Sequence, residues 1–225
     1  MALKYECLIL DHDDTAVDST ATVHYPAHVQ AMRVLRPGVA PIDLRGWFLK
    51  NFHPGLMGYL TGELGLSEQE METEYEIWRA FTTRRTPQFF PGFLEALSDY
   101  RSQGGKLAVV SHSERDVILS HYRSAQPGCD QPLLPDLVFG WETDEQKRKP
   151  SPWPVFEILK AFDLPGERAL IVDDLKPGIE MSQKAQVPAA GVGWAHRIPE
   201  VREYMQRHCL AYFDEVAEFR EFILG

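Results

Sequence analysis

The sequence predicts an α/β fold, a doubly wound and mainly parallel sheet of the Rossmann type with a small helical domain inserted after the first strand. Three observations support this prediction. Short apolar runs without polar alternation, such as Cys7–Leu10, are typical of strands covered on both faces. Segments with helical spacing alternate with such runs in the later part of the chain. Residues 20–85, in contrast, contain no convincing strand.

The first strand ends in a group of acidic residues. Asp11, Asp13 and Asp14 come directly after Leu10, in the region past a strand end where open α/β sheets bind ligands. Asp is also favoured in turns and at helix N-caps. The acidic group by itself therefore leaves two interpretations open, a turn or a functional site.

The composition excludes some classes of function. With 225 residues, 44% hydrophobic and 25% charged, the chain has room for one large domain or for a core domain and a smaller one. A net charge of −10 argues against a general binder of nucleic acid or of anionic membranes, because those surfaces are held by an excess of Lys and Arg. No apolar stretch approaches the roughly 20 residues of a membrane span, and the N-terminus does not resemble a secretory signal. We expect a cytoplasmic protein, a monomer or a homodimer, with ordinary thiols at its three separated cysteines.

The block that follows the first strand has roughly helical spacing, for example at Val29, Met32 and Leu35. Pro and Gly residues divide it into three or four short helices. We expect it to form a helical domain of residues 19–86, with residues 1–18 and 87–225 forming the α/β core. Polar and aromatic side chains gather around Gly46. They are candidates for substrate contact, although helix surface and core packing explain most residues of this kind: Arg45, Trp47, Lys50, Asn51 and His53.

From Thr86 onwards helices and strands alternate. The predicted helices cover residues 93–103, 115–123, 153–162 and 179–185, and the predicted strands cover residues 106–110, 137–140, 169–172, 189–192 and 210–213. Chemically distinctive residues follow two of these strands and precede one helix. They are Ser111 with His112, Asp173 with Asp174, and Lys149. Each of them alone is explained by a turn residue, a helix cap or a solvated charge, but the coincidence of all of them is not.

The haloacid dehalogenase (HAD) superfamily has four motifs that this sequence resembles in type and order. They are Asp11-x-Asp13-x-Thr15, Ser111, Lys149 and Asp173-Asp174. Phe90–Leu94 and Lys149–Pro152 are similar to the phosphoglycolate-phosphatase-like branch of that superfamily. The resemblance covers the whole chain, because the helical block occupies the position of the family's cap domain.

The same residues meet the needs of phosphoryl transfer, which requires a nucleophile, neutralised phosphate oxygens and a proton for the leaving oxygen. Asp11 suits the nucleophile, because a carboxylate is ionised at neutral pH without an assisting base. Asp13 would protonate the leaving group and later take a proton from the attacking water. Ser111 and Lys149 would bind phosphate oxygens, and the backbone N–H of His112 offers a further donor.

A magnesium ion would relieve the repulsion between these carboxylates and a phosphate dianion, since Mg²⁺ prefers oxygen ligands. The resemblance implies direct ligation by the side chains of Asp11 and Asp174 and by the backbone carbonyl of Asp13. It also implies that Asp173 supports the ion directly or through water.

Two positions depart from the family pattern, and a third invites comment. Asp14 stands where HAD proteins usually have Gly; because Asp tolerates left-handed backbone, we expect the turn to survive with altered mobility and an extra negative charge near the entrance. His112, where Asn is common, either contacts substrate or fills a turn. His12 should point away from Asp11 and Asp13 if strand alternation continues, which indicates a structural role.

The sequence therefore predicts a magnesium-dependent phosphatase for a small phosphorylated metabolite, with the helical domain as a cap. Asp13 argues against a dehalogenase, because a halide leaving group needs no proton. A phosphomutase shares every motif and is one alternative. A phosphonate hydrolase is another, and Lys50 would then be the imine-forming lysine of the helical block. A binding or regulatory module without turnover is a third, with only Asp14 in its favour.

Overall fold

The computed structural model describes residues 3–225. Met1 and Ala2, at the start of the predicted core domain, lie outside the described residues. The chain divides into two compact units, one made of Met1–Asp18 and Gln88–Gly225 and the other of Ser19–Pro87. Of the helices in the described part of the chain, none has the length and apolar character needed to cross a membrane.

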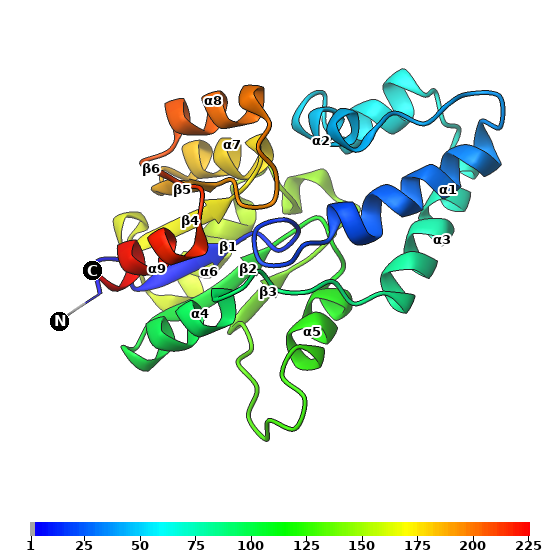
Figure 1. Cartoon of the computed structure of the whole chain (residues 1–225). Coiled ribbons are helices and arrows are strands. Elements are labelled where there is room, and N and C mark those ends of the chain that lie inside the picture. The colour runs from blue at the N-terminus through cyan, green and yellow to red at the C-terminus, as the bar shows by residue number, and fades with distance from the viewer. Residues whose placement is uncertain (1–2) are drawn as a thin grey trace. The chain divides into compact units, whose positions relative to one another are not determined.

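The first unit is built on a six-stranded sheet with the strand order β3-β2-β1-β4-β5-β6 (Figure 1). All five strand pairings are parallel, and Leu8 of the central strand pairs with Leu107 on one side and Leu170 on the other. The predicted α/β class with a doubly wound parallel sheet is confirmed. The strands are β1 (Cys7–Leu10), β2 (Lys106–Val110), β3 (Leu137–Phe139), β4 (Ala169–Asp173), β5 (Ala189–Val192) and β6 (Ala211–Phe213).

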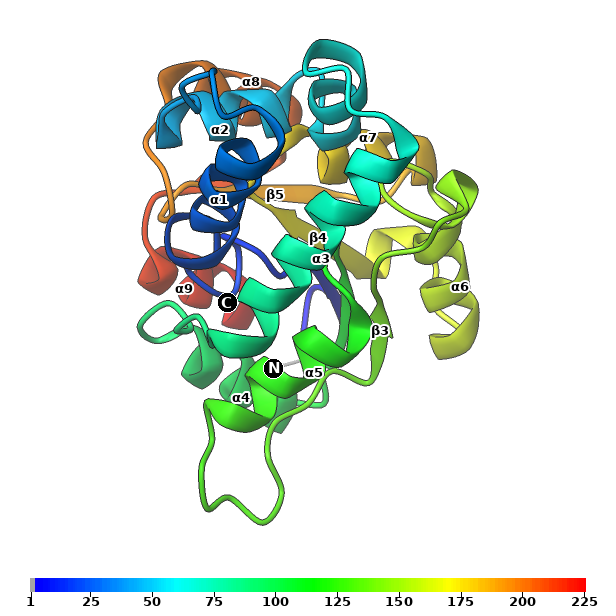
Figure 2. The same ribbon diagram turned by 90° about the vertical axis from the view of Figure 1, so that its right-hand side faces the viewer.

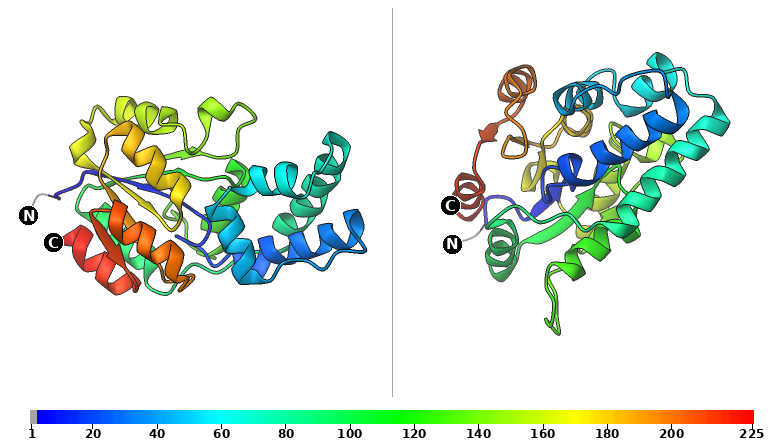
Figure 3. Two further views of the ribbon diagram at one scale, coloured as in Figure 1. Left: turned by 90° about the horizontal axis from the view of Figure 1, so that it is seen from above. Right: turned by 45° about the vertical axis from the view of Figure 1, so that its right-hand side comes forward.

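Helices cover both faces of this sheet, which explains why the strands lack polar alternation. On one face, alternate strand residues such as Leu8 and Leu10 form a core with side chains of α4 (Phe93–Ser102), α5 (Arg115–Ser124) and α9 (Val216–Leu224). Helices α4 and α9 lie side by side (Figure 3). The other face is covered by three helices that contact one another in chain order: α6 (Trp153–Phe162), α7 (Lys176–Ala185) and α8 (Pro199–His208).

The structure differs from the predicted elements mainly near the C-terminus. Helix α7 begins at Lys176, three residues before the predicted start, because Pro177 is compatible with the first turn of a helix. Helices α8 and α9 are absent from the prediction. The first buries only Val201 and Met205 of its mostly polar sequence, so its apolar stripe is narrow. Two short 3₁₀ helices, Glu145–Lys147 and Gly166–Arg168, also precede α6 and β4.

The second unit is helical, and its described residues contain no strand. A π-helical turn (Thr20–His24) continues into α1 (Tyr25–Leu35), which packs along α3 (Glu68–Arg84) (Figure 2). Ser67 caps α3 in a capping box with Glu70. Between α1 and α3 in the sequence are α2 (Leu44–Phe52) and a second π-helical segment (Gly58–Glu63). A small apolar core of its own holds this unit together: Trp47, Tyr59, Leu60 and Leu66.

Candidate active site

The carboxyl ends of β1, β2 and β4 meet at one edge of the sheet, and the site residues predicted in the α/β core lie there. Asp11 follows β1, and its backbone N–H donates to the carbonyl of Val172 at 2.8 Å. Ser111 follows β2 and donates from its backbone N–H to Phe139 of the next strand. Asp173 is the last residue of β4, and Asp174 comes directly after it. The parallel sheet thus brings together residues that are more than 160 positions apart in the sequence.

Lys149 is the buried cation of this edge. Its Nζ lies 2.5 Å from Oδ1 of Asp11 and 2.9 Å from Oδ2 of Asp173, and 5% of its side chain is exposed. Burial alone would lower the pKa of Lys149, but the two carboxylates outweigh this effect and raise it above its ordinary value. The ammonium group is therefore charged at neutral pH. Oδ1 of Asp173 accepts from the backbone N–H of Leu175 at 2.9 Å, so both oxygens of Asp173 are in use.

Two serine hydroxyls hold the carboxylate of Asp13. Oγ of Ser111 and Oγ of Ser113 both donate to Oδ2 of Asp13, at 3.1 and 2.7 Å. The backbone N–H of Ser113 in turn donates to Oγ of Ser111 at 3.0 Å. Sequence reasoning missed Ser113, although its position two residues after Ser111, past the same strand, is the signal that could have found it.

Three carboxylates could hold a metal ion. Asp11, Asp173 and Asp174 are buried, and one oxygen from each lies within 4.8 Å of the others. Burial is the largest cause that raises the pKa of Asp11 and of Asp174 well above its usual range; neighbouring carboxylates raise it further, whereas Lys149 lowers it. At this edge the carboxyl groups outnumber the ammonium group of Lys149. An all-oxygen donor set of this kind fits a hard divalent cation such as Mg²⁺.

The loop after β1 closes through a left-handed residue. Asp14 has φ of +61°, and its backbone N–H donates to the carbonyl of Val17 at 2.8 Å, so the turn survives without the glycine that the family usually has. Oγ1 of Thr15 donates to Oδ2 of Asp11 at 3.3 Å. Asp14 is 3% exposed, and its charge raises the pKa of Asp174. The extra charge thus lies buried beside Asp174, rather than at the entrance where we expected it.

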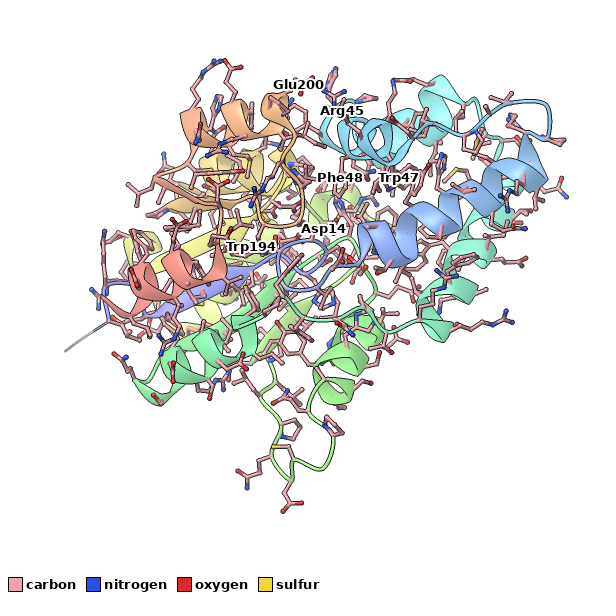
Figure 4. All side chains as sticks on the ribbon, in the orientation of Figure 1. Asp14, Arg45, Trp47, Phe48, Trp194 and Glu200 are labelled. Atoms are coloured by element: carbon pink, nitrogen blue, oxygen red, sulfur yellow. The ribbon has the colours of Figure 1, made fainter. Side chains whose placement is uncertain are left out.

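A second loop, which follows β5, also reaches the site. Nε1 of Trp194 donates to the backbone carbonyl of Thr15 at 3.0 Å, which ties this loop to the loop that carries Asp14 (Figure 4). Two residues further on, Nε2 of the buried His196 lies 3.1 Å from Oδ2 of Asp174. Sequence reasoning missed His196. Its signal was weak, because three residues separate it from the end of the predicted strand.

The two histidines considered from the sequence lie in different surroundings. His12 is fully buried and points toward α5, where its Nε2 lies 3.0 Å from Nδ1 of His121, in agreement with the expected strand alternation. Nε2 of His112 donates to the backbone carbonyl of Lys149 at 3.0 Å, and burial lowers the pKa of His112 to about 4. This contact anchors the segment that carries Lys149. Whether His112 also touches substrate stays a prediction.

The candidates from the helical block belong to the second unit. Arg45, Trp47 and Lys50 lie on α2. Arg45 and Trp47 are labelled in Figure 4. Nζ of Lys50 forms an ion pair with Glu63 at 2.5 Å. The side chain of Asn51 donates to the carbonyl of Trp47, and the Trp47 ring stacks on His28 at 4.2 Å between centroids. Trp47 and Asn51 therefore have structural roles within this unit; the exposed Arg45 and His53 stay predictions as substrate contacts.

Known proteins resemble the chain in sequence and in fold. A phosphoglycolate phosphatase from Pseudomonas savastanoi pv. phaseolicola is 25% identical over 207 residues, which cover 87% of this chain and 73% of that protein. A haloacid dehalogenase-like hydrolase from Streptococcus pneumoniae has a similar structure, with a TM-score of 0.75, 17% identity and coverage of 97% and 98% of the two chains. A CbbY mutant from Rhodobacter sphaeroides, in complex with xylulose 1,5-bisphosphate, also has a similar structure, with a TM-score of 0.70, 18% identity and coverage of 95% of this chain and 96% of that chain.

A family model adds the decisive comparison. The model of the haloacid dehalogenase-like hydrolases matches residues 55–192, more than half of the chain, and this range includes Ser111, Lys149, Asp173 and Asp174. The predicted superfamily and the predicted class of enzyme, a hydrolase, are both confirmed. The chain belongs to the haloacid dehalogenase-like hydrolases.

Proposed function

We propose that this hydrolase is a magnesium-dependent phosphatase that acts on a small phosphorylated metabolite through a phosphate ester of Asp11. The observation that carries the proposal is the buried pair of Asp11 and Lys149, 2.5 Å apart, with the second carboxylate of Asp13 held by Ser111 and Ser113. This arrangement supplies a nucleophile, a cation for the phosphate and an acid or base in one place.

In the first step, a carboxylate oxygen of Asp11 attacks the phosphorus atom and the bond from phosphorus to the ester oxygen breaks. Asp13 donates its proton to that leaving oxygen, which departs as an alcohol. Lys149 binds a non-bridging phosphate oxygen, and Ser111 binds another after its hydroxyl turns away from Asp13. The ammonium group of Lys149 suits this task because it is charged and because Asp11 and Asp173 fix its position.

In the second step, water attacks the phosphorus atom of the phosphorylated Asp11. Asp13, now ionised, takes a proton from this water, and the bond between phosphorus and the Asp11 oxygen breaks. Inorganic phosphate leaves, and both carboxylates return to their starting states. The hydroxyl of Ser113 on Oδ2 would keep Asp13 in place while Asp13 changes its protonation state.

Asp11 and Asp174 would hold the metal with their side chains, and Asp13 with its backbone carbonyl. Asp173 would act indirectly, because one of its oxygens bonds Lys149 and the other bonds the N–H of Leu175. When bound, Mg²⁺ would supply positive charge that offsets the carboxylates and the phosphate dianion. The three buried carboxyl groups of Asp11, Asp173 and Asp174, with one oxygen from each within 4.8 Å of the others, support a divalent cation at this position.

The helical unit, Ser19–Pro87, would act as the cap that excludes water during the reaction. Its Lys50 favours a phosphatase over a phosphonate hydrolase. An imine-forming lysine needs its amino group within reach of a substrate carbonyl group, whereas Nζ of Lys50 is held in an ion pair with Glu63 at 2.5 Å. The similarity to a phosphoglycolate phosphatase makes phosphoglycolate one substrate to test. A cytoplasmic location is part of the same proposal.

The test is a screen of the purified chain with Mg²⁺ against sugar phosphates, nucleotides, phosphoglycolate and phosphonoacetaldehyde, with released phosphate as the readout. We expect phosphate release from at least one ester. Asp11→Asn should lower kcat by at least about 1000-fold, because no other nucleophile replaces the carboxylate. Removal of metal with EDTA should lower kcat by a similar factor, because the positive charge that offsets the carboxylates and the phosphate is lost. Acid quenching with a ³²P-labelled ester should trap label on the unmodified chain and not on Asp11→Asn.

A matched control is Asp130→Asn, which makes the same chemical change at an exposed loop position and should keep full activity. Activity that survives in Asp11→Asn, or without metal, would contradict the proposal. Transfer of the phosphoryl group to a second hydroxyl of the substrate, without release of phosphate, would instead identify a phosphomutase.

A further inference from the structure

A buried histidine, which the reaction does not use directly, contacts one of the carboxylates that would hold the metal. We infer that His196 is a positioning residue for the metal site, because its ring holds one oxygen of Asp174 and leaves the other for the cation. This inference rests on the proposed function, since it concerns the metal that the reaction requires. His196 touches neither the phosphate nor the reacting atoms in this scheme, so its effect passes through Asp174.

The geometry defines the contact. Nε2 of His196 lies 3.1 Å from Oδ2 of Asp174, and the side chains of the two residues are 3% and 2% exposed. As a metal ligand Asp174 must be ionised, and an ionised carboxylate only accepts hydrogen bonds, so Nε2 carries the hydrogen in the metal-bound state. If the carboxylate turned, it would lose a hydrogen bond in a place that water does not reach, which is costly. The contact therefore restricts the rotation of the Asp174 side chain.

The segment that carries His196 is itself anchored. The backbone N–H of Gly193 donates to Phe213 of β6 at 2.9 Å, and Trp194 bonds the carbonyl of Thr15. A side chain at Gly193 would collide with Tyr212, because a Cβ there would lie 1.8 Å from the Tyr212 hydroxyl oxygen. The Trp194 ring also packs against Phe219 of α9. The anchored segment holds the ring of His196 in a fixed position beside Asp174. Supporting hydrogen bonds of this kind orient metal ligands and influence metal affinity.

The charges around Asp174 show why such a donor is useful. Asp14 and Asp173 both repel the ionised form of Asp174, and Asp14 also acts electrostatically on His196. In the absence of metal, this repulsion favours an orientation of the Asp174 side chain that moves its carboxylate away from Asp14 and Asp173. The hydrogen bond with Nε2 of His196 opposes this rotation, because it is made in one orientation of the carboxylate. Asp14, which replaces the usual glycine, makes this support more important here than it would be without the extra charge.

The experiment measures metal binding, without turnover, in the full chain. Isothermal titration calorimetry with Mg²⁺ should show that His196→Leu raises the dissociation constant about 10- to 100-fold, the range typical of lost supporting contacts to metal ligands. His196→Gln keeps a side-chain N–H donor and should recover part of the affinity. Arg197→Gln changes the neighbouring residue, whose side chain is 74% exposed, and should bind Mg²⁺ as the unmodified chain does.

The outcomes separate this inference from the proposed function. If the unmodified chain binds no Mg²⁺, both are wrong. If it binds Mg²⁺ and a folded His196→Leu binds equally well, only the role of His196 is overturned. Should His196→Leu fail to fold, ¹⁵N-histidine spectra of the unmodified chain decide instead, with the signal assigned from its loss in His196→Gln. The Nε2 resonance should shift with the same Mg²⁺ midpoint as the calorimetric isotherm; a resonance that stays unchanged during Mg²⁺ binding would overturn the inference.

Discussion

Asp173 accepts a hydrogen bond from the buried Lys149 at the end of β4, and its carboxylate occupies space that a side chain at Gly178 would need. Its Oδ2 accepts from Lys149 and its Oδ1 from the N–H of Leu175, so the carboxylate is fixed from both ends. Helix α7 passes close to this side chain. A Cβ at Gly178, in the first turn of that helix, would lie 1.9 Å from Oδ2 and 2.2 Å from Cγ of Asp173. Only glycine leaves the carboxylate where it is.

Gly178→Ala should therefore damage activity although it touches no proposed substrate atom. The added methyl group must displace Asp173, which moves the partner that positions Lys149. We expect kcat/KM to fall about 100-fold, since misplacement of a binding group by about 1 Å has an effect of this size. Steady-state kinetics and circular dichroism measure this. Gly62→Ala is the control, because a Cβ there meets no atom within 4 Å. Unchanged kinetics in a folded Gly178→Ala would contradict the prediction.

Single residues also show where sequence reasoning reached its limit. Asp11, Ser111, Lys149 and Asp173 were predictable, because each is a chemically distinctive residue at a predicted strand end or before a predicted helix. Gly178 was not, since its importance lies in a distance to a side chain that only the folded chain defines. His196 likewise gains its meaning from a contact across two loops, 22 positions from Asp174.

At the scale of elements, the strength of the apolar pattern decided what could be predicted. Strands β1, β2 and β5 have the predicted bounds, because each is a short run without polar alternation, which in β2 follows Lys106. The prediction missed α9 even though Val216, Phe219 and Ile223 repeat at helical spacing and are buried. In α8 the signal was weaker, because most of its residues are polar and its packing depends on contacts with α7 and β5.

The helices of the second unit enclose a histidine that should make this unit sensitive to acid. His28 on α1 is 1% exposed, and its ring stacks on Trp47 of α2. Burial lowers the pKa of His28 to about 4, compared with 6.5 in an unfolded chain. Between these values the unfolded chain binds a proton that the folded chain does not. The free energy of unfolding should therefore fall as the pH falls from about 6.5 to 4, by up to about 3 kcal/mol from this residue.

Urea unfolding followed by Trp fluorescence at several pH values between 7 and 4 tests this prediction. His28→Phe keeps a flat ring for Trp47 but removes the titration, so its unfolding free energy should depend less on pH in this window. Some dependence should persist, because burial also lowers the pKa of His112 to about 4. The exposed variant His208→Gln should retain the full pH dependence. An equally steep dependence in His28→Phe would rule out His28 as the cause.

For the whole molecule, the site concentrates charge that the fold alone does not balance. Buried carboxylates from the ends of β1 and β4 face one buried ammonium group, that of Lys149. Such a site costs stability in the metal-free chain, because buried like charges repel and because the ionised carboxylates have lost water. The sequence predicted the type and place of these groups. The sequence could not predict how far these charges offset one another, because this depends on the buried position of Asp14 and on the contact of His196 with Asp174.

Mg²⁺ should therefore stabilise the folded chain. A ligand that binds only the folded state at 100 times its dissociation constant adds about 2.7 kcal/mol, which for a chain of this size raises Tm by roughly 5–10 °C. Scanning calorimetry after EDTA treatment, with and without Mg²⁺ at constant ionic strength, measures the shift. It should shrink as the pH is lowered, because Asp11 and Asp174 must be ionised to bind metal and their pKa values are raised. Asp174→Asn is expected to change both measurements. Without metal, its Tm should equal or exceed that of the unmodified chain, since a buried repulsion is removed. Added Mg²⁺ should have little effect on its Tm. A full Mg²⁺ shift in Asp174→Asn would mean that the ion binds elsewhere on the molecule.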